Sequence, residues 1–155
     1  MTPKVVIEEF EARPMAAVFE RVPPGKVGAR FREHLDKVYA FLAARPELRK
    51  PGAHNIFFYR HEEPKLDDLL AVEFCVEAAN AFDGAGEVFC SWLPPGKVAT
   101  AVHIGPYEKL HETHAAVTAW IKANGRRTGN ASWEIYGDWT DDPAKLETKV
   151  CYLLK

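Results

Sequence analysis

The sequence has few cysteines, and no two of them stand at the spacing of a metal-binding or redox pair. Cys75, Cys90 and Cys151 are an odd number of thiols, and no C-x-x-C motif joins any of them. A disulfide framework needs an even set of cysteines and an oxidising compartment, so a reduced cytoplasmic setting is the simpler interpretation. All three residues stand in strand-like apolar segments, which favours inert buried thiols over a reactive nucleophile.

The sequence also lacks an excess of either charge and a long apolar run. Lys and Arg, 20 in number, nearly balance 22 Asp and Glu, which gives a formal net charge of −2 at pH 7. The basic stripe that marks many nucleic-acid-binding proteins is therefore not expected. No run reaches the roughly 18 apolar residues of a membrane helix, and the N-terminal stretch is too acidic for a signal peptide. We expect neither direct nucleic-acid binding nor contact with a membrane.

Motifs of the common catalytic and cofactor sites are absent as well. The sequence has no G-x-S-x-G nucleophile elbow, no P-loop and no G-x-G-x-x-G loop. The stretch His111-Glu112-Thr113-His114 falls one residue short of the H-E-x-x-H spacing that places two zinc ligands one helical turn apart. No cysteine or aspartate completes a ligand set with these histidines or with His103, so we expect no metal site and no cofactor.

What the sequence does contain is a pair of amphipathic helix patterns. Apolar residues recur at alternating spacings of four and three, which places them on one stripe of an α-helix. The two stripes are Phe31, Leu35, Val38 and Leu42, and then Leu110, His114, Val117 and Ile121. Pro46 should bound the first helix, Pro106 suits the first turn of the second, and Gly125 suits its C-terminal cap. His114 stands in an apolar stripe, which predicts a hydrogen-bonded histidine in the core.

The two stripes correspond residue by residue, and the strand-like segments around them repeat too. The segments before the helices are 15–22 and 98–104, and those after them are 56–59 with 71–76 and 133–136 with 149–154. We therefore predict a single α+β domain over residues 1–155, built from two tandem β-α-β-β repeats at about 4–80 and 86–155. Such repeats should pair edge to edge into one curved antiparallel sheet with both main helices on one face. The seam between pseudo-symmetric halves is then the natural place for a ligand cleft.

The strongest chemical signal lies in the segment Trp133–Trp139. Alternation along a strand places Glu134 and Tyr136 on one face and Trp133 on the other. A carboxylate buried there is costly as an anion unless it has a partner. Glu134 could thus bind a cationic or hydrogen-bonding ligand beside aromatic faces, or act as a general acid or base. The alternative is that it faces solvent, as most glutamates do.

A second glutamate stands in a similar apolar strand. Glu73 follows Val72 and precedes Phe74, so it faces away from both of them. Two interpretations remain open from this pattern. Glu73 is either a surface carboxylate or a second acidic group in the seam between the repeats.

Residues 94–107, which end in Gly105-Pro106-Tyr107, resemble the strand and helix start of the GyrI-like small-molecule-binding domain. This domain also forms the effector-binding part of some AraC- and MerR-type transcription regulators. The resemblance continues through Trp133–Tyr136 and the last strand, and it spans essentially the whole chain. The first half departs from the pattern, with Val22-Pro23-Pro24 where a Gly-Pro-Tyr would stand. The resemblance implies a duplicated β-α-β-β fold with a ligand cleft at the pseudo-two-fold seam.

The resemblance also implies which residues line the cleft. It assigns the acidic residue to Glu134 and the aromatic residues to Tyr107 and Tyr136, and Trp133 or Trp92 would supply a further aromatic wall. Members of the family sense drugs, inhibit DNA gyrase or open strained cyclopropane rings by hydrolysis. A domain that fills the chain leaves no room for a helix-turn-helix.

Three functions follow as hypotheses. The first is binding of a lipophilic or cationic xenobiotic or metabolite, and the second is hydrolysis of strained electrophiles with Glu134 and Tyr107 as catalytic residues. The third is contact with a protein partner such as a regulator or gyrase. The residues favour a binding protein over an enzyme.

Overall fold

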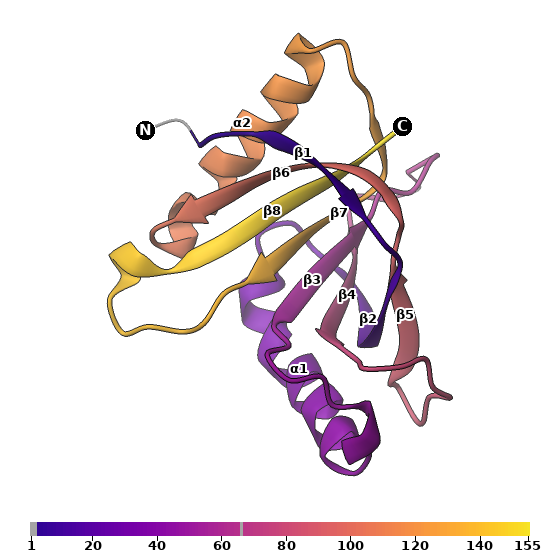
Figure 1. Ribbon diagram of the computed structural model, residues 1–155. Coiled ribbons are helices and arrows are strands. Elements are labelled where there is room, and N and C mark those ends of the chain that lie inside the picture. The colour runs from indigo at the N-terminus through magenta and orange to yellow at the C-terminus, as the bar shows by residue number, and fades with distance from the viewer. Residues whose placement is uncertain (1–2, 66) are drawn as a thin grey trace.

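The computed structural model describes residues 3–65 and 67–155, and its main feature is one eight-stranded antiparallel sheet (Figure 1). The strands are β1 (Val6–Phe10), β2 (Arg13–Val22), β3 (Asn55–Arg60), β4 (Leu70–Glu77), β5 (Phe89–Leu93), β6 (Gly96–Ile104), β7 (Thr128–Tyr136) and β8 (Glu147–Leu154). The helices are α1 (Val27–Ala43) and α2 (Leu110–Ala123), with short 3₁₀ helices η1 (Pro46–Leu48), η2 (Tyr107–Lys109) and η3 (Pro143–Lys145).

The strand order, β1-β6-β8-β7-β3-β4-β2-β5, is symmetric about the central β3–β7 pair. Each half of the chain supplies one helix and three neighbouring strands, β3-β4-β2 from the first half and β7-β8-β6 from the second, so the predicted duplicated α+β fold with a single curved antiparallel sheet is confirmed. The outermost strands are exchanged between the halves. β1 pairs with β6 of the second half and β5 with β2 of the first, which the helix and strand patterns did not predict.

Both α-helices follow the apolar stripes that the sequence shows. Val38 on α1 and Val117 on α2 are fully buried at the centres of these stripes. α1 ends at Ala43, just before Pro46, and Gly125 takes a positive φ of 67° after α2. Pro106 precedes the 3₁₀ turn η2, so α2 itself begins later than expected, at Leu110. In the described part of the chain, neither helix is long and apolar enough to cross a membrane.

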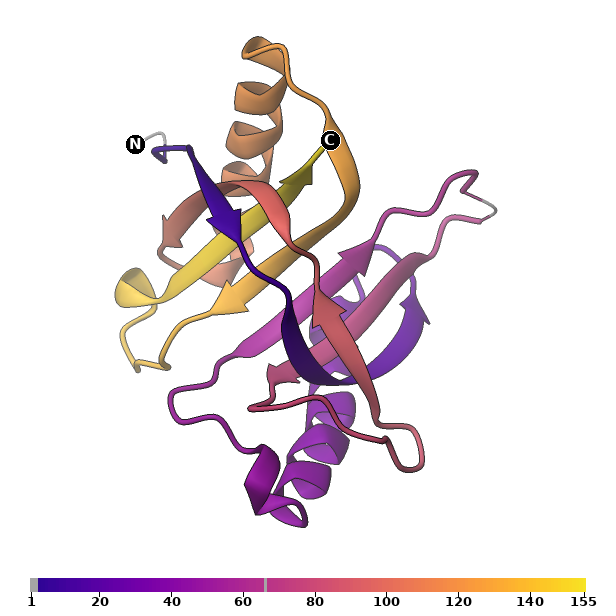
Figure 2. The same ribbon diagram turned by 45° about the vertical axis from the view of Figure 1, so that its right-hand side comes forward.

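The apolar interior is divided between the two faces of the sheet. On the helix face, one cluster lies under α1 and another under α2. On the opposite face, a third cluster is closed by the segments that lead from β1 to β2 and from β5 to β6, which cross there (Figure 2). Phe10 and Leu93 from these crossing segments pack in the same cluster as Trp133. On the helix face α1 packs on β2 and β4 and α2 on β6 and β8, while the chain crossings cover the opposite face at the centre of the sheet.

The burial of the thiols leads to a chemical test of the fold. Cys75 and Cys151 are fully buried, and burial raises the pKa of both thiols, to about 12 for Cys151. The thiolate is the reactive species, so we expect Ellman's reagent to modify only the partly exposed Cys90 in the folded protein. Guanidinium should release the other two thiols. A Cys90→Ser variant that still reacts rapidly when folded would contradict this assignment.

Candidate functional site

Glu134 stands at the pseudo-two-fold centre of the sheet. It is paired across the β3–β7 seam with Phe57, and both side chains lie on the helix face because directly opposite residues in an antiparallel pair share a face. Tyr59 and Tyr136 stand two residues further along their strands and so lie on the same face. The symmetry of the seam thus places one carboxylate, one phenylalanine and two tyrosines together.

The carboxylate of Glu134 is buried, with 5% of the residue exposed, and both of its oxygens have hydrogen-bond partners. The hydroxyl of Tyr136 donates to Oε1 at 2.7 Å, and that of Tyr59 donates to the same oxygen at 3.2 Å. His114 on α2 places Nε2 2.6 Å from Oε2. A buried carboxylate needs such partners, because an unpaired buried anion is costly.

His114 extends this network to β8. Its Nδ1 lies 2.8 Å from the hydroxyl of Tyr152. A neutral imidazole that donates from Nε2 to Glu134 must accept at Nδ1, and the Tyr152 hydroxyl can supply that hydrogen. In that tautomer the hydrogen bonds run in one direction, from Tyr152 through His114 to Glu134.

The three tyrosines stay protonated near neutral pH. Burial, followed by the nearby charge of Glu134, raises the pKa of Tyr59, of Tyr136 and of Tyr152, the last to about 12. A protonated phenol is a hydrogen-bond donor and carries no charge. The two hydroxyls that contact the carboxylate, those of Tyr59 and Tyr136, are therefore neutral donors.

The raised pKa of Tyr152 predicts a loss of stability in alkaline solution. Below the ordinary pKa of 10.0, folded and unfolded chains both keep the proton, but between 10.0 and about 12 only the unfolded chain loses it. The free energy of unfolding therefore falls as the pH rises through this window. In Tyr152→Phe the slope should be shallower by up to about 1.4 kcal/mol per pH unit. Urea denaturation at several alkaline pH values measures it, and equal slopes would contradict the prediction.

A cavity of about 500 Å³ opens beside this network. Glu134, His114, Ser132, Tyr59 and Tyr152 line its inner part, and the exposed ends of β3 and β4 with the segment between them form its rim. The volume lies within the range of about 300–1,000 Å³ that is typical of small-molecule sites. The rim carries both signs of charge, with Arg60, Lys65 and Glu62 among its residues.

Tyr107 contacts the network around Glu134 through the ring of Tyr136. Its ring packs edge-on against Tyr136 at 5.6 Å between centroids, and Tyr136 in turn packs against Phe57 at 4.7 Å. Tyr107 is 42% exposed, and neither Tyr107 nor Tyr136 lines the cavity itself. The structure thus brings Glu134, Tyr136 and Tyr107 into one contiguous group.

Three other residues that the sequence suggested lie elsewhere. Trp133 and Glu73 are buried on the opposite face of the sheet, where Trp133 stacks on Phe58 and Glu73 accepts hydrogen bonds from Arg60 and Ser91. The third, Trp92, stands on the edge strand β5, where it is 47% exposed and paired with a proline at the start of β2. None of these three lines the cavity beside Glu134.

Three residues of the network were not singled out as site residues from the sequence. Tyr59 corresponds to Tyr136 in the repeat, so the duplication could have identified Tyr59 as a site residue. Tyr152 could be placed on one face by strand alternation, but its neighbour across the sheet could not. His114 was expected to be a hydrogen-bonded core histidine, and its partner proves to be Glu134.

The other two histidines near α2 have different partners. His103 places Nδ1 2.8 Å from the hydroxyl of Thr113 and Nε2 3.0 Å from the carbonyl oxygen of Pro106. His111 places Nδ1 3.0 Å from the carbonyl oxygen of Glu108. Within residues 3–65 and 67–155, no group of three or more His, Cys, Asp or Glu side chains is placed to hold a metal ion.

Solved structures with the same fold include three of particular relevance. The C-terminal domain of EcmrR is 19% identical, with a TM-score of 0.84 over 100% of this chain and 99% of that one. SAV2435 bound to tetraphenylphosphonium is 14% identical, with a TM-score of 0.70 over 98% and 94%. A hydrolase from Listeria innocua is 13% identical, with a TM-score of 0.68 over 99% and 93%. At these identities the likeness concerns the fold.

The family of the chain follows from a match that covers nearly its whole length. In the complex of EcmrR with DNA, the matching part is 58% of the EcmrR chain. No curated protein sequence matches this chain. The GyrI-like small molecule binding domain family matches residues 3–155. The chain therefore belongs to the family of GyrI-like small-molecule-binding domains.

Proposed function

We propose that this domain binds a lipophilic cation in the cavity beside Glu134. The observation that carries the proposal is a buried carboxylate at the inner end of a cavity of about 500 Å³, surrounded by tyrosine rings. The attraction between opposite charges is several times stronger at such a partly buried position than in water. The presence of tetraphenylphosphonium in the SAV2435 structure supports the same class of ligand.

The chemistry of the cavity suits a bulky cation better than a small one. A cation whose charge is spread over an apolar body is weakly hydrated, so its transfer into the cavity costs little. The faces of Tyr59 and Tyr152 can stabilise it further through their quadrupoles. Glu134 meanwhile keeps its hydrogen bonds, so binding does not require the network to be dismantled.

Isothermal titration calorimetry with tetraphenylphosphonium tests the proposal. Calorimetry is preferable to tryptophan fluorescence, because none of the four tryptophans lines the cavity. We expect one site with a Kd on the order of micromolar. The neutral control, triphenylphosphine oxide, should bind at least about tenfold more weakly. Equal affinities for the two compounds would contradict a role for charge.

A second candidate function is hydrolysis of a strained electrophile in the same cavity. The observation that favours it is the contact between a carboxylate and a hydroxyl donor that both line the cavity, Glu134 and Tyr59, 3.2 Å apart. Glu134 would take a proton from water as the water oxygen bonds to a cyclopropane carbon. The ring C–C bond would break, and the carbon that receives its electron pair would be protonated by Tyr59, which lines the cavity. Tyr107 and Tyr136 are less suited to this step, because neither of them lines the cavity.

Mass spectrometry distinguishes the two functions. A hydrolase would convert an electrophilic cyclopropane into a product heavier by one water, and Glu134→Gln would abolish the conversion. If the protein binds tetraphenylphosphonium but converts no compound of a cyclopropane panel, binding is the function that remains supported. Contact with a protein partner, such as a regulator or gyrase, stays a prediction.

A further inference from the structure

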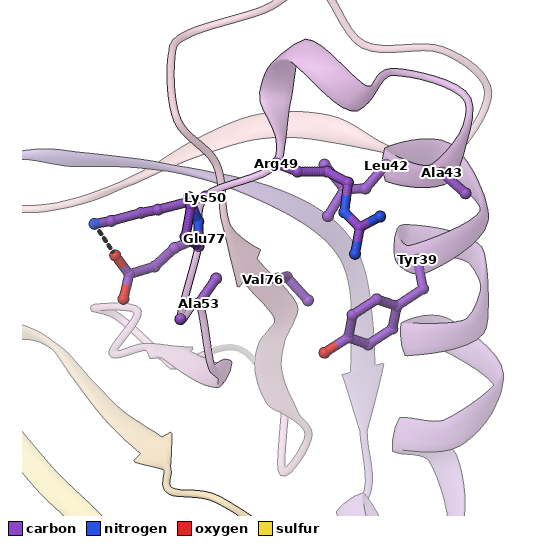
Figure 3. A pocket seen from close by; sticks show the side chains of 10 residues that line it. Tyr39, Leu42, Ala43, Arg49, Lys50, Ala53, Val76 and Glu77 are labelled. Carbon is purple, nitrogen blue, oxygen red and sulfur yellow. Dashed lines mark hydrogen bonds and ion pairs between the residues drawn. The ribbon is translucent and has the colours of Figure 1, made fainter.

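A second cavity, of about 580 Å³, lies at the C-terminal end of α1. It opens between α1, the loop 49–53 and the end of β4, and it shares no lining residue with the cavity beside Glu134 (Figure 3). Leu42, Ala53 and Val76 give it apolar walls. Its size matches that of a small-molecule site, and nothing in the network around Glu134 accounts for it.

Arg49 points into this cavity from its edge (Figure 3). Its backbone N–H donates a hydrogen bond to the carbonyl oxygen of Pro46 at 3.2 Å, and the residue forms an isolated antiparallel β-bridge with Ala78. The neighbouring cations Arg45 and Lys50 form ion pairs, whereas Arg49 forms none within the described residues. A guanidinium on a fixed backbone that lacks a carboxylate partner is well suited to bind an anion in a bidentate manner.

The other charged groups of the cavity also favour an anion. Lys50 Nζ lies 2.6 Å from Glu77 Oε2, while Arg13 lies 3.9 Å from the other oxygen of the same carboxylate. Because Arg13 also lies beside Glu77, Lys50 can donate hydrogen bonds to a ligand without leaving a buried anion unpaired. Two cations and one carboxylate line the cavity, which gives it a positive balance.

Tyr39 adds a neutral polar group on the α1 side. Its hydroxyl donates to the side-chain oxygen of Asn55, and its ring faces the cavity (Figure 3). Burial raises the pKa of Tyr39, so the phenol contributes no negative charge near neutral pH. The cavity thus combines an apolar floor, an aromatic wall and the guanidinium of Arg49.

We propose that this cavity is a second ligand site, which takes an amphipathic anion: a carboxylate, sulfonate or phosphate group on a small apolar body. Arg49 binds the anionic group, with Lys50 as a second donor, and the apolar body lies against Leu42 and Val76. The cavity beside Glu134 has a carboxylate in the corresponding role. On the function proposed for the cavity beside Glu134, the two sites take ligands of opposite charge.

Fluorescence titration with 1-anilinonaphthalene-8-sulfonate tests this site. We expect saturable binding to the wild-type protein at concentrations up to about 1 mM, and affinity at least about tenfold lower in Arg49→Glu. Arg45→Ala is the matched control, because it removes a cation four residues away that pairs with Glu47 and does not line the cavity. Arg49→Lys, which keeps the charge and loses the bidentate geometry, should fall between wild type and Arg49→Glu.

Several outcomes would overturn the proposal. Absence of saturable binding to the wild-type protein is one, and equal losses in Arg49→Glu and Arg45→Ala are another. N-phenyl-1-naphthylamine, the uncharged analogue, should be insensitive to Arg49→Glu, and an equal loss for it would rule out charge recognition. Displacement of the sulfonate probe by tetraphenylphosphonium would assign the probe to the other cavity. Glu134→Gln should leave probe binding unchanged, so failure at one site is distinguishable from failure at the other.

Discussion

Glu134→Gln should lower the affinity for tetraphenylphosphonium by roughly ten- to a hundredfold, the largest effect expected of any change in the cavity. The substitution keeps the shape of the side chain and removes its charge. At 4 Å and an effective dielectric constant of about 20, the lost attraction is about 4 kcal/mol, and the desolvation that the neutral amide avoids offsets part of it. Calorimetric titration of wild type and variant measures the difference.

The surrounding donors can accommodate the amide that Glu134→Gln introduces, so the variant should stay folded. His114 can change tautomer and accept at Nε2 from the amide, while the tyrosine hydroxyls keep donating to the amide oxygen. Asp138→Asn is a matched control, since it removes one carboxylate charge from a fully exposed side chain further along the same segment. Equal losses in the two variants, or unchanged affinity in Glu134→Gln, would contradict the role proposed for this carboxylate.

Trp133→Ala should lower the free energy of unfolding by about 3–5 kcal/mol, the largest stability effect expected of a single substitution here. Trp133 is fully buried, its ring stacks on Phe58 at 5.7 Å and it packs against Phe10 at 5.8 Å. Removal of such a side chain leaves a cavity beneath the chain crossings, because the surrounding side chains relax only partly into the space. Guanidinium denaturation followed by far-UV circular dichroism measures the loss.

Two further variants separate a structural role of Trp133 from a ligand-binding one. Trp139→Ala removes a tryptophan that is 76% exposed and should change stability by no more than about 0.5 kcal/mol. Trp133→Phe keeps most of the buried ring and removes an indole N–H that has no hydrogen-bond partner within the described residues, so the protein should stay folded and keep its affinity for tetraphenylphosphonium. A folded Trp133→Phe variant that no longer binds the cation would restore Trp133 as a wall of the ligand site.

The repeat pattern predicted the fold well because both of its signals are local. A stripe of apolar residues on a helix and alternation on a strand depend only on residues close in sequence. Phe31–Leu42 and Leu110–Ile121 could therefore be matched, and so could the strands after them. The exchange of β1 and β5 between the halves could not be predicted, because the choice of partner strand depends on contacts between segments far apart in the chain.

Glu73 and Glu134 show which part of a side chain's environment the sequence predicts and which part depends on the tertiary structure. Each is a glutamate within an apolar strand, and alternation determined by itself that each faces away from its immediate neighbours. Only the assembled sheet decided what each would face. Glu73 meets Arg60 and Ser91 under the chain crossing, whereas Glu134 meets His114 and a cavity between helix and hairpin. The direction of a side chain is a property of its own strand, but its neighbours are supplied by strands and helices that only folding brings together.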